Sequence, residues 1–94
     1  MEEEVVRVRM PRGKELFGTI IEMLGASRFR VDCGDGKVRI CRIPGKMKRR
    51  IYVKMGNVVL VEPWDVQPVD RGDIIWRYTP AQMNWLVRHG FLKT

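Results

Sequence analysis

A cluster of cationic side chains in the middle of the chain is the feature with the clearest chemistry. Residues 42–54 (R-I-P-G-K-M-K-R-R-I-Y-V-K) hold no acid and one aromatic residue, Tyr52. Their basic residues are Arg42, Lys46, Lys48, Arg49, Arg50 and Lys54. Such side chains displace counterions condensed on a phosphate backbone, and a nearby aromatic ring can stack on an unpaired base. The cluster predicts a nucleic-acid contact, with a solvated basic linker as the alternative.

The charge of the chain is concentrated around this cluster. The 94 residues carry a net charge of +7, yet residues 27–54, with ten basic and two acidic residues, carry +8 by themselves. A basic surface this localised favours nucleic acid ahead of a membrane surface as partner, and no apolar run approaches the roughly 18–20 residues of a membrane span. The N-terminal M-E-E-E is acidic where an export signal is basic and then apolar, so we expect a cytoplasmic protein.

Groupings that would support catalysis or metal binding are not evident in the sequence. It holds one histidine, no Ser/His/Asp combination and no glycine-rich phosphate loop, which argues against an enzyme. Cys33 and Cys41 fall in predicted strands, and with the distant His89 they do not supply the four ligands of a zinc site. We expect buried thiols that act as small apolar side chains, and neither metal nor cofactor.

Five short strands are predicted to carry the basic residues. They span residues 15–24, 28–33, 37–43, 58–63 and 73–79, and residues 34–36 (G-D-G) form a tight hairpin turn between the second and third. Gly18, inside the first strand, is typical of a bend or a close approach between strands. The basic cluster then falls in the connection between the third and fourth strands, as a loop or a single helical turn.

Alternation along the second and third strands predicts a basic face on the sheet. The side chains expected to point inward are Phe29, Val31, Cys33, Val38 and Ile40. Those expected to share the outer face are Arg28, Arg30, Lys37 and Arg39. Like charges opposed in this way repel each other by a few tenths of a kcal/mol per pair. A polyanionic partner would relieve that repulsion.

Two flanking segments complete the chain. Residues 1–14 break at Pro11 and Gly13 and predict a mobile N-terminal arm whose basic residues could touch a partner. Residues 15–79 form the barrel, and residues 80–94 form a C-terminal helix and tail. The helix is expected to begin with a capping box at Thr79 and Gln82, with Pro80 at its first position, and to end at Gly90.

The predicted fold is all-β, a five-stranded oligonucleotide-binding (OB) barrel followed by a short α-helix. Barrels of this kind bind nucleic acid with strands two and three and the adjoining loops, where the basic face is predicted. An SH3-like barrel has a similar strand count and remains open. The sequence also leaves open whether Trp64, at the end of the fourth strand, stacks on RNA or packs into the core.

Around the basic cluster the sequence resembles translation initiation factor 1A of archaea and eukaryotes and, more distantly, the bacterial factor one. The resemblance rests on F-R-V-D-C-G-D-G-K-V, then G-K-M-K-R-R-I-Y-V-K, then G-N-V-V-L-V-E-P-W-D, and continues into the C-terminal helix. The sequence lacks the basic N-terminal and acidic C-terminal tails of eukaryotic members of the family, and this difference points to an archaeal type.

This resemblance implies a non-catalytic protein at the decoding (A) site of the small ribosomal subunit, where family members promote binding of initiator tRNA and mRNA and help select the start site. Ribosomal RNA is then the direct partner of a monomer, and other initiation factors, including the subunit-joining GTPase, are further expected partners. The residues expected to contact RNA are Arg28, Arg30, Lys37, Arg39, Arg42, Lys46, Lys48, Arg49, Arg50, Tyr52, Lys54 and Trp64.

Two other functions compete with this expectation. A general single-strand binder or RNA chaperone of the cold-shock kind relies on exposed aromatic rings on strands two and three, and here the only candidate, Phe29, is predicted to point inward. A permanent structural protein of the ribosome would use the same basic face, but would not leave washed subunits reversibly.

Overall fold

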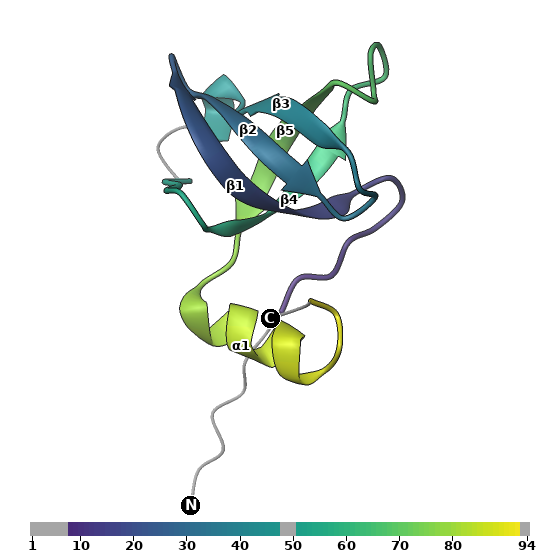
Figure 1. Cartoon of the computed structure of the whole chain (residues 1–94), viewed down its shortest axis with the longest axis vertical. Coiled ribbons are helices and arrows are strands. Elements are labelled where there is room, and N and C mark those ends of the chain that lie inside the picture. The colour runs from purple at the N-terminus through teal and green to yellow at the C-terminus, as the bar shows by residue number, and fades with distance from the viewer. Residues whose placement is uncertain (1–7, 48–50, 93–94) are drawn as a thin grey trace, which may run out of the picture.

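The computed structural model describes residues 8–47 and 51–92 (Figure 1). In chain order its elements are β1 (Leu16–Gly25), β2 (Arg28–Cys33), β3 (Val38–Arg42), the 3₁₀ turn η1 (Gly45–Met47), β4 (Val58–Pro63), β5 (Arg71–Arg77) and α1 (Pro80–Arg88). Three predicted contact residues, Lys48, Arg49 and Arg50, lie outside the described residues.

The five strands close into a barrel in the order β1-β2-β3-β5-β4. Strand β1 closes it, because residues 16–19 pair with β4 and residues 18–25 pair with β2. All neighbours run antiparallel except β3 and β5, which pair in parallel from Ile40–Arg71 to Arg42–Asp73. The predicted five-stranded OB barrel with a short C-terminal helix is confirmed.

Gly18 allows β1 to pair with two strands at once. A Cβ atom at this position would lie 2.5 Å from Cγ1 of Val31 and 3.2 Å from Cγ2 of Val61, closer than packed atoms tolerate. The close approach predicted at Gly18 is therefore confirmed.

The orientation predicted for β3 is wrong. Arg39 is 4% exposed and lies opposite Val31, on the inner face of the sheet, and Cys41 is also fully buried there. Val38, in contrast, is 48% exposed, and Ile40 is half-buried on the outer face. The outer face therefore does not carry Arg39.

The hairpin turn explains this reversal. The backbone N–H of Cys33 donates to the carbonyl of Lys37 at 2.9 Å, and Gly36 adopts a left-handed φ of +81° between them. Because residues 33 and 37 are opposed across a three-residue turn, every odd-numbered residue of β3 faces the same side as Cys33. Turn geometry thus overrides the apolar alternation of β3.

Two apolar clusters hold the molecule together. The first fills the barrel and contains Ile20, Phe29, Val31, Cys33, Cys41, Ile43, Ile51, Val53, Val59, Val61 and Ile74. The second has a buried centre of Val58, Leu60, Tyr78 and Leu86, with Val8, Met10, Phe17, Ile75, Met83, Trp85 and Leu92 packed around it. The second cluster joins the outer surface of the barrel to α1 and to the N-terminal segment (Figure 1).

The described part of the predicted N-terminal arm, residues 8–14, contacts the rest of the protein. Val8 and Met10 pack into the second cluster, and the Tyr78 hydroxyl donates to the carbonyl of Arg9. The carboxylate of Glu15 accepts from the guanidinium of Arg9 at 3.4 Å. The apolar side chains at positions 8 and 10 thus attach this segment to the second cluster.

The boundaries of α1 are those expected. The Thr79 hydroxyl accepts from the backbone N–H of Gln82 at 3.2 Å, and the Gln82 side chain accepts from the backbone N–H of Thr79 at 2.9 Å. At the other end Gly90 has a φ of +80°, and the N–H of Phe91 donates to the carbonyl of Leu86. The capping box and the glycine stop are confirmed.

Candidate nucleic-acid interface

Two arginines face each other on the outer surface of the β2–β3 hairpin. Arg28 and Arg42 are directly opposed in the strand register, and both side chains are exposed. Opposed like charges on neighbouring strands are destabilising unless an anion lies between or above them. This pair, rather than the predicted set that included Lys37 and Arg39, forms the cationic centre of the face.

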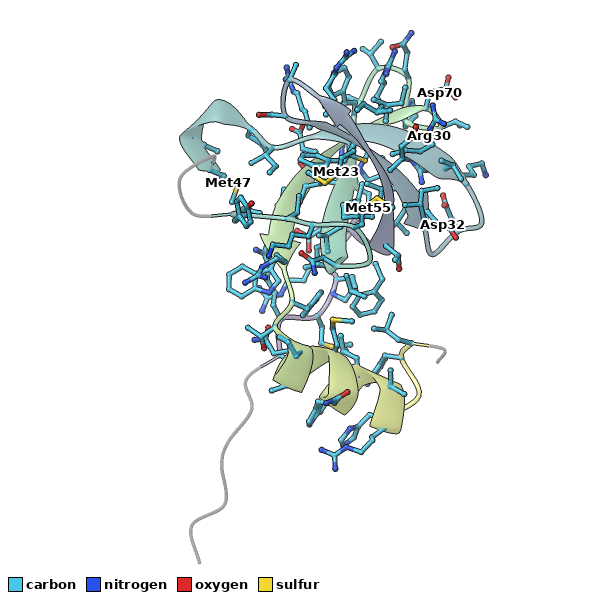
Figure 2. All side chains as sticks on the ribbon, turned by 60° about the vertical axis from the view of Figure 1, so that its left-hand side comes forward. Met23, Arg30, Asp32, Met47, Met55 and Asp70 are labelled. Carbon is cyan, nitrogen blue, oxygen red and sulfur yellow. The ribbon has the colours of Figure 1, made fainter. Side chains whose placement is uncertain are left out.

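Arg30 lies on the same face but is partly neutralised. Its guanidinium forms an ion pair with Glu22 of β1 at 2.8 Å, the two residues being opposed in the β1–β2 register. Figure 2 shows Arg30 on the outer side of β2, with Asp32 further along the strand toward the hairpin turn. Lys37 is exposed in that turn. Arg30 and Lys37 are therefore available at the edge of the face, away from its centre.

Trp64 stands beside Arg42 and is fixed by Asp73. The indole N–H donates to Oδ1 of Asp73 at 2.8 Å, and the Arg42 guanidinium lies 4.8 Å from the centre of the indole ring. The same Asp73 oxygen accepts from Arg42 at 3.4 Å. Trp64 is half-buried, so its ring is held at the surface and is not part of the barrel core.

A hollow of about 380 Å³ lies between these groups. Its lining residues are Arg28, Ile40, Cys41, Arg42, Trp64, Gln67 and Arg71. Three guanidinium groups, an indole and an amide thus surround one space, which suits a nucleotide with its phosphate and base. Sequence reasoning missed Gln67 and Arg71, because the parallel pairing of β3 with β5 that brings them here leaves no local signal.

A second hollow extends this surface toward the basic cluster. It has a volume of about 400 Å³ and is lined by Ala26, Ser27, Arg28, Arg42, Ile43, Pro44 and Gly45. Its far end reaches the start of η1, where Lys46 is exposed. Arg28 and Arg42 therefore connect the Trp64 hollow with the basic cluster in one continuous surface.

The last four residues of the basic cluster, 51–54, alternate strictly between interior and surface. Ile51 and Val53 are buried in the barrel, whereas Tyr52 is 73% exposed and Lys54 is exposed with its Nζ 5.8 Å from the Tyr52 ring. Tyr52 is thus an aromatic surface beside a cation, as a base-stacking role requires. Met47, at the end of η1, lies on the side of the barrel away from Asp32 (Figure 2).

Arg39 is buried, but its charge is fully paired. Its guanidinium donates to both carboxylate oxygens of Asp35, at 3.0 and 2.8 Å, and its Nε donates to the carbonyl of Pro68 at 2.6 Å. Hydrogen bonding from Arg39 lowers the pKa of Asp35 from 3.8 to about 2. Arg39 therefore lies beneath the surface, with its guanidinium hydrogen-bonded to Asp35 and Pro68.

Both cysteines are buried in the barrel. Cys33 is 4% exposed and Cys41 is 0% exposed. A hydrogen bond with Cys33, and then burial, raise the pKa of the Cys41 thiol. Within residues 8–47 and 51–92, no three His, Cys, Asp or Glu side chains cluster so as to hold a metal ion.

A family model described as "Translation initiation factor 1A / IF-1" matches residues 3–94. The chain belongs to this family. The described helix, α1, is not long and apolar enough to cross a membrane.

Archaeal members of the translation initiation factor 1A family match nearly the full length of the chain. The factor from Archaeoglobus fulgidus is 52% identical over 94 residues, covering 98% of this chain and 96% of the relative. The factor from Thermococcus kodakarensis is 56% identical over 90 residues, covering 94% and 77%. The predicted resemblance is confirmed, and the chain is a translation initiation factor of archaeal type.

A solved bacterial structure supports the fold. The bacterial translation initiation factor one from the Wolbachia endosymbiont of Brugia malayi superposes with a TM-score of 0.54 at 30% identity. The match covers 73% of this chain and 82% of that one. The SH3-like alternative is thereby set aside in favour of the OB barrel.

Proposed function

We propose that this translation initiation factor binds ribosomal RNA at the decoding (A) site of the small ribosomal subunit. There it promotes binding of mRNA and initiator tRNA and start-site selection, without catalysing a reaction and without a cofactor. Its direct partner is rRNA, and its further partners are other initiation factors, including the subunit-joining GTPase. The protein acts as a cytoplasmic monomer. The observation that carries the proposal is the opposed pair Arg28 and Arg42 beside Trp64, within a family of initiation factors.

The hollow next to Trp64 supplies three kinds of contact that RNA requires. Arg28, Arg42 and Arg71 offer guanidinium groups for phosphate oxygens, which they can grip with two parallel hydrogen bonds. Trp64 offers an indole for a base, and Gln67 offers an amide that both donates to and accepts from a base edge. Lys46, which follows Gly45 at the end of the second hollow, extends the contact, and the exposed Tyr52 and Lys54 continue it along the basic cluster, with Lys48, Arg49 and Arg50 expected to join them.

Chemical probing of the rRNA in purified archaeal small subunits tests this proposal. With the native protein we expect protection confined to nucleotides of the decoding site. The double variant Lys48→Glu, Arg49→Glu should lose nearly all of that protection at an unchanged melting temperature, because it reverses charge in the basic cluster. Protection scattered over many rRNA regions, or absent from the decoding site, would contradict the proposal. A large loss of folding stability in the variant would contradict the assignment of the cluster to RNA binding.

A general RNA chaperone of the cold-shock kind is the second candidate. It is favoured by the exposed ring of Tyr52, but it also needs stacking rings on β2 and β3. Phe29, the only aromatic residue on those strands, is 7% exposed inside the barrel.

A permanent ribosomal protein is distinguished by washing, since an initiation factor leaves the subunits reversibly at raised salt and a structural protein remains bound.

A further inference from the structure

The loop between β4 and β5, residues 64–70, forms one wall of the hollow beside Trp64, yet it has little apolar packing to hold it. Val66 and Val69 are 75% and 50% exposed. Gln67 has a φ of +60°, a left-handed conformation that residues other than glycine rarely adopt. A loop with exposed apolar side chains and a strained residue needs fixed points outside itself to keep one conformation.

Contacts from β3 supply the buried fixed points. The Nε of Arg39 donates to the carbonyl of Pro68 at 2.6 Å, and the backbone N–H of Ile40 donates to the carbonyl of Asp70 at 2.9 Å. At the start of the loop, Asp65 forms an ion pair with Lys14, which is exposed and weakened by salt. Among the described residues, Arg39 is thus the only one whose side chain hydrogen-bonds to the middle of the loop from inside the protein.

Arg39 in turn is oriented by the hairpin turn between β2 and β3. Asp35 accepts from both terminal nitrogens of the guanidinium, which fixes its plane and leaves Nε aimed at Pro68. The Asp35 carboxylate also accepts from the backbone N–H of Lys37 at 3.2 Å, so the turn fixes it as well. The Arg39 side chain is 5% exposed, which leaves almost none of it for a partner to touch.

We infer that Arg39 is a positioning residue for RNA binding. Held by Asp35, it ties the β2–β3 turn to the β4–β5 loop and so keeps Gln67 in the wall of the hollow that Arg28 and Arg42 also line. This role rests on the proposed RNA-binding function, and it differs from the direct contact that the sequence predicts for Arg39. Preorganising the wall of a binding site raises affinity because less ordering is required on binding.

The positioning role and a pure charge effect predict opposite changes in RNA affinity for one of two variants. Asp35→Asn makes the protein more positive and, by charge alone, should strengthen RNA binding, whereas Arg39→Met makes it less positive and should weaken binding. A positioning role predicts that both variants bind more weakly, each by about tenfold, since both release the same loop. Asp32→Asn is the matched control, because it makes the same charge change in the same hairpin. Asp32, on β2 (Figure 2), is exposed and forms no side-chain hydrogen bond or ion pair within the described ranges.

The experiment measures equilibrium binding of the full chain to an unstructured RNA of mixed sequence across a salt series. On single-stranded RNA, the slope of log affinity against log salt falls by about 0.7 for each phosphate that the protein no longer neutralises, so it should stay unchanged in Arg39→Met. We expect Asp35→Asn and Arg39→Met to bind RNA more weakly than the native protein, with the same slope of log affinity against log salt. Asp32→Asn should bind RNA equally or slightly more tightly. A reduced slope in Arg39→Met, or tighter binding by Asp35→Asn, would overturn the inference.

Amide hydrogen exchange of the free protein provides a readout independent of RNA. The N–H groups of Asp70 and Arg71, both bonded to the carbonyl of Gln67, should exchange about tenfold faster in the two variants, while Ile20 and Tyr78 in the barrel should not change. Unchanged exchange at residues 70 and 71 would show that Arg39 does not hold the loop. If native protein binds small subunits and free RNA alike, the proposed function fails, yet the exchange data still decide the role of Arg39.

Discussion

At the scale of single residues, the surface combines charges that repel each other with charges that are paired. Arg28 and Arg42 oppose each other in the register and are exposed, with Arg42 in a long contact to Asp73 at 3.4 Å, whereas Arg30 and Arg39 are paired with Glu22 and Asp35 at 2.8 Å. The opposed pair gains by the arrival of an anion, because its repulsion is relieved on binding. The free cationic capacity of the sheet face is therefore concentrated beside Trp64.

Replacing Arg28 and Arg42 together by glutamine tests this assignment. With two fewer phosphates neutralised, the slope of log affinity against log salt on single-stranded RNA should fall by about 1.4, and RNA binding should weaken by at least tenfold. Removing the repulsion should leave the free energy of unfolding unchanged or slightly raised. The measurements are a binding series in salt and urea unfolding. A fall in stability of more than about 1 kcal/mol would mark the pair as structural.

Asp35 gives a prediction in pH. Its folded pKa of about 2 lies below the ordinary value of 3.8, so the Arg39–Asp35 pair stabilises the fold above that ordinary value. This contribution is lost as the pH falls from 3.8 through 2, where the carboxylate becomes protonated. Urea unfolding of native protein and Asp35→Asn across this range should give curves that converge toward low pH. Curves that remain parallel would contradict the low pKa.

At the scale of elements, α1 and the N-terminal segment depend on each other through the second apolar cluster. Leu86 is 0% exposed at its centre, and Val8 and Met10 of the N-terminal segment pack against the cluster. The helix has only nine residues, too few to be stable alone in water, so tertiary packing must hold it. The interior of the barrel is filled by a separate cluster.

Leu86→Ala should therefore cost about 2–5 kcal/mol of packing at the helix, the range expected for a buried leucine. Because the barrel core is separate, we expect the loss as early opening of α1 and residues 8–10 in amide exchange, with the barrel strands still protected. Thr79→Ala, which removes only the cap, should cost about 1 kcal/mol and serves as the milder control. Simultaneous loss of protection in α1 and the barrel would show that the two clusters form one cooperative unit.

The elements also show what a sequence can predict. The span of β2, the buried β4 and the caps of α1 follow from local patterns, and they are found as expected. The faces of β3 could not be predicted from its own residues, because a three-residue turn decides which side each one takes. Arg71 and Gln67 reach the hollow through the parallel β3–β5 pairing, a contact between distant segments that no local pattern signals.

At the scale of the whole molecule, the barrel separates two surfaces. The β2–β3 face, the Trp64 hollow and η1 form a continuous basic surface on the barrel, while α1 and the N-terminal segment lie at the other end (Figure 1). The central claim is that this basic surface matches one site on the small ribosomal subunit, and that it is more than a general attraction for polyanions.

Equilibrium binding of the full chain to purified archaeal small subunits and to an unstructured RNA of mixed sequence, each across a salt series, tests this claim most directly. A surface matched to one rRNA site keeps hydrogen bonds and stacking that salt does not screen, whereas general attraction depends on counterion release alone. We predict strong binding at one protein per subunit near physiological salt, while binding to free RNA is lost at moderate salt. Parallel decline of both affinities with similar slopes would contradict the account.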